Sequence, residues 1–599
     1  MSGSRKRRLH VANTLGLACV AATCFLAACS DSDGGGDDTS KAGTAGSGRA
    51  GSGSAGKAGG SATAGNGGSS ASGAGQAGDK NVAGEGGEGG EGGEGGEAGA
   101  QTGGAGGSTA GSGGAPVVLT PHCVRDTTSG KKVEISASGN DGLYAAAYGP
   151  DGKLYAAGFV QTGTGAAEDR STVVVRLTDT GALDTTWATG GVATVNVNAS
   201  ASDISGQAEL PRGLAFQGNK LIVAGTVEAF TTKQTNTAYN ADRNVYVLRL
   251  NADGSLDNTF GDIATAVPTP GIHILPLSAG VLNTAGDGVS GADQQWGLNV
   301  LPDNKLIVTA ATRNGGVNAD TTPRTDTDFA VVKLTADGAQ DATFGLVGGT
   351  AGLFTLDVAQ ASASVCTASV LSDGKLIITG YSTYGGSQRP VIFKLLANGS
   401  ALDPSFGAAG IFSEPVGTAA EAYGALVQAS GKLVTVGYGR ATSANTTSDI
   451  LSLRLTASGV LDTSYGTASG RTWFDVGGLG DNGRAIVLSD DRPVLFGGGS
   501  LSTGQQDAVI TVLSAEGKML GSLGGGGAGG AGGSGGSAGA FTSFGTPFGC
   551  KAYDFGSVGD FFWAGAVAPN GKIAAVGLTT HASGSTEDTD GIFVLVDKP

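Results

Sequence analysis

The chain has 599 residues, of which 111 are glycine, and its formal net charge is −16. An average protein contains roughly 7% glycine, so this composition excludes a single ordinary domain. The pI near 4.7 excludes a nucleic-acid binder that follows the phosphate backbone, because such a protein needs a basic face.

Residues 1–28 have the features of an export signal. The basic stretch Arg5–Arg8 precedes the apolar run Val11–Ala28, which ends in small residues, as secretory signal peptides do. The run is marginal in length for a membrane span, and an acidic, polar segment follows it. We therefore predict a cleaved signal peptide, with a retained membrane anchor as the alternative.

The end of this segment, Leu26-Ala27-Ala28-Cys29, resembles the bacterial lipobox. The resemblance implies cleavage before Cys29 and attachment of diacylglycerol to its thiol; an ordinary signal with an incidental cysteine is the alternative. Ser30, by the same resemblance, favours sorting to the outer membrane. We expect an exported protein that is lipid-anchored to the outer membrane or cell surface of a two-membrane bacterium.

Residues 29–116 are predicted to form a disordered tether. The stretch Asp31–Pro116 contains no Leu, Ile, Phe, Tyr or Trp, so it cannot bury enough apolar area to offset the entropy of ordering. A glycine-rich coil of this length has an r.m.s. reach of roughly 50 Å. The tether would hold the rest of the chain away from the membrane.

Residues 117–599 carry seven copies of a turn phrase, of which Pro150–Leu154 is a well-formed example. Asp-Gly or Asn-Gly between two short apolar runs predicts a tight hairpin, because the turn needs positive φ. Each copy has a basic residue at the predicted hairpin tip: Lys153, Lys220, Lys305, Lys375, Lys432, Arg492 and Lys572.

Two more apolar runs complete each unit. In the first unit these are Thr172–Leu177 and Val192–Val197, and between them lies a Leu-Asp-x-x-aromatic motif, Leu183–Trp187. Four strands per unit in seven units predict an all-β fold, a seven-bladed β-propeller. The sixth unit is interrupted by a glycine-rich insert at residues 524–540.

The two ends of this region are expected to share one sheet. The seventh unit ends with Ile592–Val596 and has no fourth run of its own, whereas the single run Lys132–Ser136 precedes the first unit. We expect this N-terminal strand to complete the last blade and close the ring, which would remove an exposed sheet edge.

The segment Arg249–Gly261 and its counterparts resemble the bacterial delta-60 repeat. The resemblance covers about residues 131–599. It implies a propeller-like β fold, and it brings no activity and no catalytic residues to transfer.

A charge pairing recurs in five units. A basic residue on the third run accompanies the aspartate of the Leu-Asp motif, whereas the sixth and seventh units lack both. Joint presence or absence indicates structural ion pairs, because either charge alone would be buried without a partner; a ligand-facing ring is the alternative. The predicted pairs are Arg176 with Asp184, Arg249 with Asp257, Lys333 with Asp341, Lys394 with Asp403, and Arg454 with Asp462.

Two further sets of charges are weak candidates for binding. The basic hairpin tips would form a ring on one face for an anionic glycan or lipid head group; solvated turn residues are the alternative. Asp326–Asp328 and Glu587–Gly591 offer oxygens to Ca²⁺, but neither has the spaced ligands and terminal bidentate Glu of a calcium loop. We predict no cofactor.

Cys123 and Cys550 are a candidate disulfide, because an exported protein permits one. Cys123 precedes the predicted N-terminal strand and Cys550 precedes the run that starts at Lys551, and neighbouring sheet positions would bring the two cysteines together. Cys366 is expected to be a small buried hydrophobe rather than a nucleophile. His122, His273 and His581 show no metal-ligand spacing. We predict no catalytic residues.

These features predict a monomeric binding or interaction module presented on a tether, with an unknown protein or glycan ligand and with the membrane as a partner through the lipid. A propeller hydrolase or lyase with a metal-assisted site is one alternative, and an envelope spacer without a dedicated ligand is another.

Overall fold

The computed structural model describes residues 123–599, except for residues 137–138, 164–168, 199–208, 230–241, 263–268, 279–280, 283–287, 290–292, 318–323, 467–469, 520–548 and 582–587. The predicted signal peptide (1–28), Cys29, the tether (29–116) and the insert (524–540) lie outside the described residues. The described part is built from strands, with one 3₁₀ turn at Tyr384–Gly386. The prediction of an all-β fold is confirmed. None of the described segments is a helix long and apolar enough to cross a membrane.

Consecutive antiparallel strands form five separate four-stranded sheets. The first contains β3 (Asp141–Tyr148), β4 (Leu154–Thr162), β5 (Asp169–Leu177) and β6 (Val192–Val195). The second contains β7 (Leu210–Gln217), β8 (Lys220–Glu228), β9 (Arg243–Leu250) and β12 (Ile272–Leu275). The third contains β15 (Gln294–Val300), β16 (Leu306–Arg313), β17 (Thr327–Leu334) and β18 (Leu353–Leu356).

The fourth sheet contains β19 (Ala363–Val370), β20 (Leu376–Ser382), β21 (Arg389–Leu395) and β22 (Ile411–Phe412). The fifth contains β23 (Ala419–Val427), β24 (Leu433–Arg440), β25 (Asp449–Leu455) and β26 (Arg471–Phe474). Two short ribbons accompany the second sheet: β10 (Gly261–Asp262) with β11 (Thr269–Pro270), and β13 (Val281–Leu282) with β14 (Gly288–Val289).

A nine-stranded sheet holds two further groups of four strands and one extra strand. One group is β27 (Asp481–Ser489), β28 (Arg492–Ser502), β29 (Gln505–Val512) and β30 (Cys550–Tyr553), with β1 (Val124–Asp126) parallel to β30 at its edge. The other group is β31 (Gly559–Val567), β32 (Ile573–Thr580), β33 (Gly591–Val596) and β2 (Lys131–Val133). A single parallel residue pair, Gln506 with Gly559, joins the two groups. We call the two groups the sixth and seventh sheets.

The N-terminal strand β2 pairs with β33 near the end of the chain. Lys132 lies opposite Ile592, and Val133 lies opposite Gly591. β2 is shorter than the predicted run because the backbone amides of Ile135 and Ser136 donate to the Asp141 carboxylate, at 3.0 and 2.9 Å, instead of continuing the strand. The strand β1 was not predicted.

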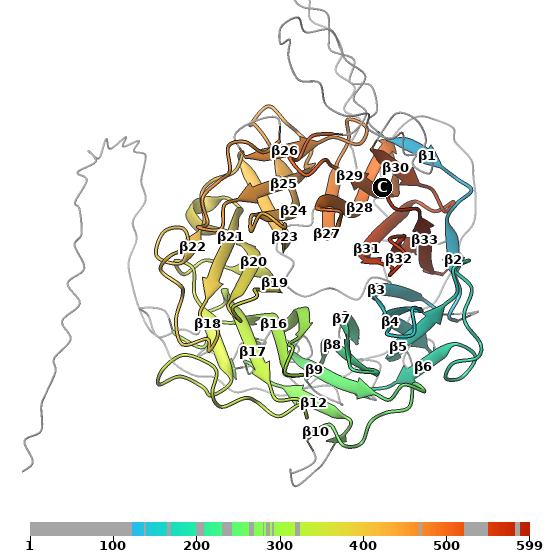
Figure 1. Ribbon diagram of the computed structural model, residues 1–599, viewed down its shortest axis with the longest axis horizontal. Coiled ribbons are helices and arrows are strands. Elements are labelled where there is room, and N and C mark those ends of the chain that lie inside the picture. Colours follow the sequence, from blue (N-terminus) through green and yellow to red (C-terminus); the bar gives the residue numbers. More distant parts are fainter. Residues whose placement is uncertain are drawn as a thin grey trace, which may run out of the picture. The chain divides into compact units, whose positions relative to one another are not determined.

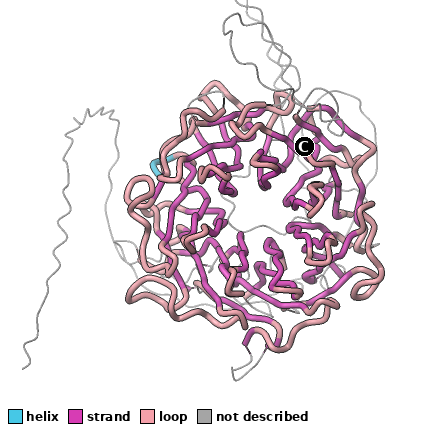
Figure 2. Tube along the Cα trace, in the orientation of Figure 1, coloured by secondary structure: helices cyan, strands magenta, loops and turns pink. Residues whose placement is uncertain are grey.

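Figures 1 and 2 show the sheets around a common centre, with the first strand of each sheet innermost. Neighbouring first strands contact one another in the order β3, β7, β15, β19, β23, β27 and β31, and β31 contacts β3. The hydrophobic core lies between adjacent sheets. Between the seventh and first sheets, for example, it contains Val133, Leu143, Val576 and Phe593. Each sheet therefore buries both of its faces.

The turn phrases form tight hairpins between the first and second strands. In the first sheet, the Asp151 carboxylate accepts the backbone N–H of Lys153 at 3.1 Å, and Gly152 has a φ of 74°. Asp stabilises such a turn through its side chain, and Gly adopts positive φ without steric cost.

Candidate functional site

Every innermost strand contains one irregularity in its pairing with the second strand. In six strands a single residue is left out of the pairing, as in a β-bulge. These residues are Tyr144, Arg212, Trp296, Tyr423, Arg484 and Trp563. In the fourth sheet the irregularity covers Val365 and Cys366. A bulge redirects a side chain, so seven equivalent positions are aimed differently from the rest of their strands.

Glycine on the second strand makes room for this irregularity. A Cβ atom on Gly437 would lie 1.9 Å from the backbone oxygen of Glu421, two residues before Tyr423. The same close approach would occur at Gly158, Gly497 and Gly577, at 1.8 to 1.9 Å. Only glycine allows two backbones to approach so closely. In these four sheets the glycine on the second strand therefore accommodates the irregularity of the innermost strand, whereas Ala310 holds the equivalent position in the third sheet.

The six large side chains contact one another in a closed cycle, which we call the central belt. The Arg212 guanidinium carbon lies 4.2 Å from the ring centroid of Trp296 and 5.9 Å from that of Tyr144. That of Arg484 lies 4.1 Å from Tyr423 and 4.9 Å from Trp563. Ring contacts complete the cycle: Tyr144 with Trp563 at 4.8 Å, and Trp296 with Tyr423 at 6.1 Å. Cation–π contacts of this kind are attractive and hold both partners in place.

Cys366 occupies the equivalent position in the fourth sheet and does not join the belt. Its thiol is fully buried and donates to the backbone oxygen of Ala330 at 3.6 Å. Burial raises the pKa of this thiol to about 12. Thr367, the next residue, lines the centre instead. The belt therefore has six members although seven sheets surround it.

A pocket of about 320 Å³ lies against the central belt and is lined by all seven innermost strands. The other lining residues lie one to three positions after a belt position, or after Cys366, in the chain. Those directly after it are Ala145, Gly213, Gly297, Thr367, Gly424, Ala485 and Ala564, and residues further along include Leu298, Ser369 and Ile486. The pocket therefore lies on the side of the belt towards the first-to-second strand turns. Arg212 and Arg484 are its only charged lining residues among those described.

Buried acids fix the innermost strands to the preceding sheets. Glu209, three residues before Arg212, accepts the backbone N–H of Thr172 at 2.8 Å and of Val197 at 2.8 Å. Asp141, Asp293, Asp481 and Asp560 hold equivalent positions and also accept backbone N–H groups. Burial raises the pKa of Glu209 to about 8, and the pKa values of Asp141 and Asp293 to about 7.

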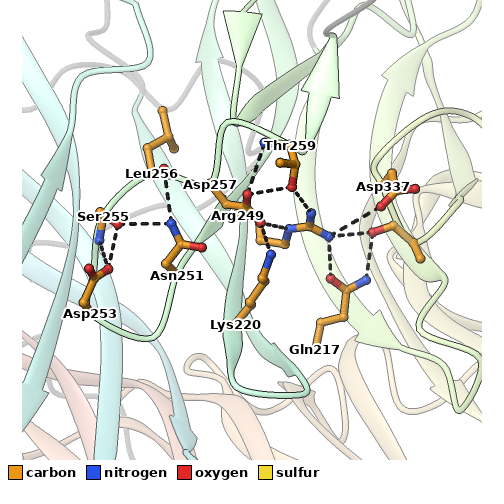
Figure 3. Close-up of polar contacts among 11 residues, drawn as sticks. Gln217, Lys220, Arg249, Asn251, Asp253, Ser255, Leu256, Asp257, Thr259 and Asp337 are labelled. Atoms are coloured by element: carbon orange, nitrogen blue, oxygen red, sulfur yellow. Dashed lines mark hydrogen bonds and ion pairs between the residues drawn. The ribbon is translucent and has the colours of Figure 1, made fainter.

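The predicted ion pairs are present in four of the five units. Their closest N–O distances are 3.0 Å for Arg176–Asp184, 2.7 Å for Arg249–Asp257, 3.5 Å for Lys394–Asp403 and 2.7 Å for Arg454–Asp462. Figure 3 shows the second-sheet pair, where Arg249 Nη1 also donates to the backbone oxygen of Ala336 in the third sheet's turn, at 2.9 Å. In the second and fifth sheets the arginine of the pair thus also links its sheet to the next one, since Arg454 Nη1 donates to the backbone oxygen of Ala515 at 2.7 Å.

In the third sheet a different cation holds the aspartate. Lys305 Nζ lies 2.8 Å from Asp341, whereas Lys333 lies over the ring of Phe344 at 5.8 Å. Lys333 and Asp341 form no ion pair in the described part of the chain. The pairing predicted there is replaced by one from the hairpin tip.

The six lysines at the hairpin tips have carboxylate partners of their own. Lys153, Lys220, Lys375 and Lys432, like Lys305, pair with the Leu-Asp aspartate of the same sheet, at 2.5 to 3.9 Å. Lys572 lies 3.9 Å from Asp597, and Arg492 begins β28. The tips of the first five sheets are therefore part of the same ionic clusters as the aspartates of the predicted pairs. A ligand-binding role for this ring stays a prediction.

Cys123 and Cys550 form a disulfide with a Cα–Cα distance of 4.7 Å. It fastens β1 beside β30. His273 lies on β12 and His581 follows β32, while His122 is outside the described residues.

The first calcium candidate is an ionic cluster. The carboxylates of Asp326 and Asp328 gather with that of Asp357, and Arg324 pairs with both Asp326 and Asp357. Glu587 of the second candidate lies outside the described residues. Calcium binding at either place stays a prediction.

Four segments match a family model described as a domain of unknown function (DUF5122), a β-propeller: residues 219–260, 301–344, 371–406 and 428–465. The chain carries β-propeller repeats. Each matched segment includes a hairpin tip of the second to fifth sheets and extends to the aromatic residue of the Leu-Asp motif. No curated protein sequence matches this chain.

Solved structures with a similar arrangement are distant. A protein of unknown function from Dyadobacter fermentans is 9% identical, with 79% of this chain and 99% of that chain covered and a TM-score of 0.40. The leech intramolecular trans-sialidase is 10% identical, with 79% and 70% covered and a TM-score of 0.33. A mannose phosphorylase from Leishmania mexicana is 15% identical, with 52% and 85% covered and a TM-score of 0.26. Scores this low carry no information about the activity of this chain.

The sequence did contain a signal for the central belt. Counting back eight or nine residues from the basic residue of each turn phrase gives Tyr, Arg, Trp, Cys, Tyr, Arg and Trp in the seven units, and the next residue is always Gly, Ala or Thr. The order Tyr-Arg-Trp thus occurs twice, separated by Cys366. A comparison of the units at this spacing picks out the belt positions, although it does not show where their side chains lie.

Proposed function

We propose that the protein is an exported lipoprotein whose seven sheets form a closed, seven-bladed propeller of delta-60-type repeats, and that this propeller is a binding module with its ligand site in the central pocket. The pairing of β2 with β33 and the contact of β31 with β3 support a closed ring. The lipobox resemblance at Cys29 supports the anchor.

The observation that carries the binding role is the central belt. Six large side chains from six different sheets are turned into the centre by equivalent bulges, and two of them are arginines. A merely structural centre needs no such arrangement, whereas concave sites with a few convergent polar groups on a rigid frame are typical of ligand-binding pockets.

A thermal-shift panel of mono- and disaccharides, organic acids, nucleotides and short peptides tests the binding role. A ligand at 100 times its Kd stabilises the folded state by about 2.7 kcal/mol, so a true ligand raises Tm by several degrees. Trp296→Phe and Trp563→Phe should weaken that rise, whereas Trp473→Phe, outside the pocket, should preserve it. A panel without any hit would favour the alternative that the protein is an envelope spacer without a dedicated ligand.

The anchor is tested separately. Cys29→Ala should abolish incorporation of labelled fatty acid and move the protein from the detergent phase to the aqueous phase. Retention in the detergent phase would contradict lipid attachment at Cys29.

A further inference from the structure

Resting on the proposed function, we propose that the central pocket binds an acidic sugar of monosaccharide size, with its carboxylate held by Arg212 and Arg484 and its hydroxyl groups against the innermost strands. The proposal depends on charge, on the exposed strand edges and on the volume of the pocket.

Charge selects an anion. Both guanidinium groups lie near the same ring, that of Trp563, at 5.8 Å for Arg212 and 4.9 Å for Arg484. The described lining contains no Asp or Glu, although acidic residues outnumber Lys and Arg by 52 to 36 in the chain. Glu421, which accepts the Tyr423 hydroxyl at 2.9 Å, is not a lining residue. Two cations near one another in a concave site attract an anion.

Arginine further selects a planar anion. Its guanidinium presents a rigid fork of donors that matches the two oxygens of a carboxylate. The rings beneath the two arginines restrict their rotation, because each guanidinium carbon lies 4.1 to 4.2 Å from an aromatic centroid. The donors are therefore held in place before a ligand arrives, which reduces the entropy lost on binding.

The walls suit hydroxyl groups. Each innermost strand is the end strand of its own group of four at the level of the pocket, and an end strand has backbone N–H and C=O groups without a ladder partner. The residues directly after the belt positions are Gly, Ala or Thr, so these seven positions place no large side chain over the strand ends beside the belt. The lining hydroxyl groups of Thr367 and Ser369 already donate to the backbone oxygens of Tyr423 and Ala425, and the hydroxyl groups of a sugar ring can make the same kind of contact with the remaining end-strand groups.

The volume limits the size of the ligand. About 320 Å³ is at the lower end of the range for small-molecule pockets, which is roughly 300 to 1,000 Å³. The belt lines one end of the pocket. One sugar ring, either free or at the end of a chain, fits this space.

Tryptophan fluorescence of the full-length protein provides the test, because Trp296 and Trp563 are two of only four tryptophans. The probes are D-glucuronate and D-galacturonate, with D-glucose and D-galactose as neutral counterparts and D-glucose 6-phosphate as a non-planar anion. We expect saturable spectral changes with a uronate, binding at least about tenfold tighter than that of the neutral sugar, and weakening by added salt.

Arg212→Gln and Arg484→Gln should each weaken uronate binding about tenfold or more, because each removes charge-assisted hydrogen bonds. Arg440→Gln, on the exposed end of β24, is the matched control and should bind as the unchanged protein does. The salt dependence needs no variant, so it tests the proposal even if an arginine variant fails to fold.

Three results would overturn the proposal. Equal affinity for a uronate and its neutral sugar would show a pocket that does not select charge, with the binding role intact. Tighter binding of D-glucose 6-phosphate than of either uronate would show that the site selects a phosphate and not a carboxylate. No response to either uronate, together with a hit in the wider panel, would remove the acidic sugar alone, whereas flat results in both experiments would remove the binding role as well.

Discussion

Asp257 holds two cations at one oxygen: its Oδ2 lies 2.7 Å from Arg249 Nε and 2.5 Å from Lys220 Nζ. Burial by itself would raise the pKa of Asp257, but the hydrogen bonds from Lys220 and Thr259 and the charge of Arg249 lower it well below its usual value. The same cluster recurs around Asp403 and Asp462. It is the charged part of the repeat.

Asp257→Asn should therefore destabilise the protein strongly. The Arg249 side chain is only 6% exposed, and removal of one partner of a buried pair costs about 3–5 kcal/mol. The free energy of unfolding in urea measures the loss. Asp337→Asn is the control, because Asp337 is 80% exposed and 4.0 Å from Arg249; a comparable loss in both variants would contradict the role of burial.

Gly437→Ala should destabilise the fifth sheet. Its Cβ would lie 1.9 Å from the Glu421 oxygen, and overpacking of this kind costs about 1–3 kcal/mol. Gly424→Ala, on the facing strand, places its Cβ 3.6 Å from Ile486, an ordinary contact. That variant should be neutral or up to about 1 kcal/mol more stable. Thermal unfolding distinguishes the two, and equal Tm values would show that the bulge does not depend on Gly437.

Removal of the disulfide should lower stability by about 2–4 kcal/mol, because Cys123 and Cys550 are 427 residues apart and their bond restricts the unfolded chain. The double variant Cys123→Ala/Cys550→Ala tests this by thermal unfolding. Reductant should lower Tm of the unchanged protein and have no effect on the double variant. Sensitivity of the double variant to reductant would contradict the assignment, since the remaining described cysteine, Cys366, is free.

The stability of the protein should fall as pH rises from about 4 to about 8. Burial raises the pKa of Glu209 to about 8 and those of Asp141 and Asp293 to about 7, so in this range the folded state binds more protons than the unfolded state. The pKa values of Asp257 and Asp462 are lowered in the folded state, so the stability that these two groups contribute is lost only as pH falls below about 4. Tm should be several degrees higher at pH 5 than at pH 8.

Glu209→Gln should reduce this pH dependence, since the amide does not titrate. Its burial, with Glu228 as a neighbouring charge, is the reason for the raised pKa. A Tm that rises between pH 5 and pH 8 in the unchanged protein would contradict the prediction.

The repeat architecture was visible in the sequence because turns and paired charges are local. Asp151 and Gly152 specify a hairpin by themselves, and Arg249 and Asp257 are only eight residues apart. Lys220 was not recognised as the third member of that pair because the hairpin brings it there from 37 residues away.

The central belt was not predicted, because a bulge breaks the alternation on which strand patterns depend. Tyr144 reads in sequence as one more apolar residue of a buried strand, and Arg212 as an isolated charge. Only the pairing with the second strand shows that both are turned to the centre. The shortening of β2 by Asp141 was equally invisible, because it depends on a side chain that lies further along the chain.

The place left by Cys366 has a consequence for molecular handedness. Trp296 and Tyr423 meet across it at 6.1 Å, the longest of the neighbour contacts in the cycle, so the floor of the pocket is uneven and has a seam on one side. The gap breaks the rotational equivalence of the two Tyr-Arg-Trp runs around the belt, so in this chiral lining mirror-image guests meet different neighbours and should bind with unequal affinity.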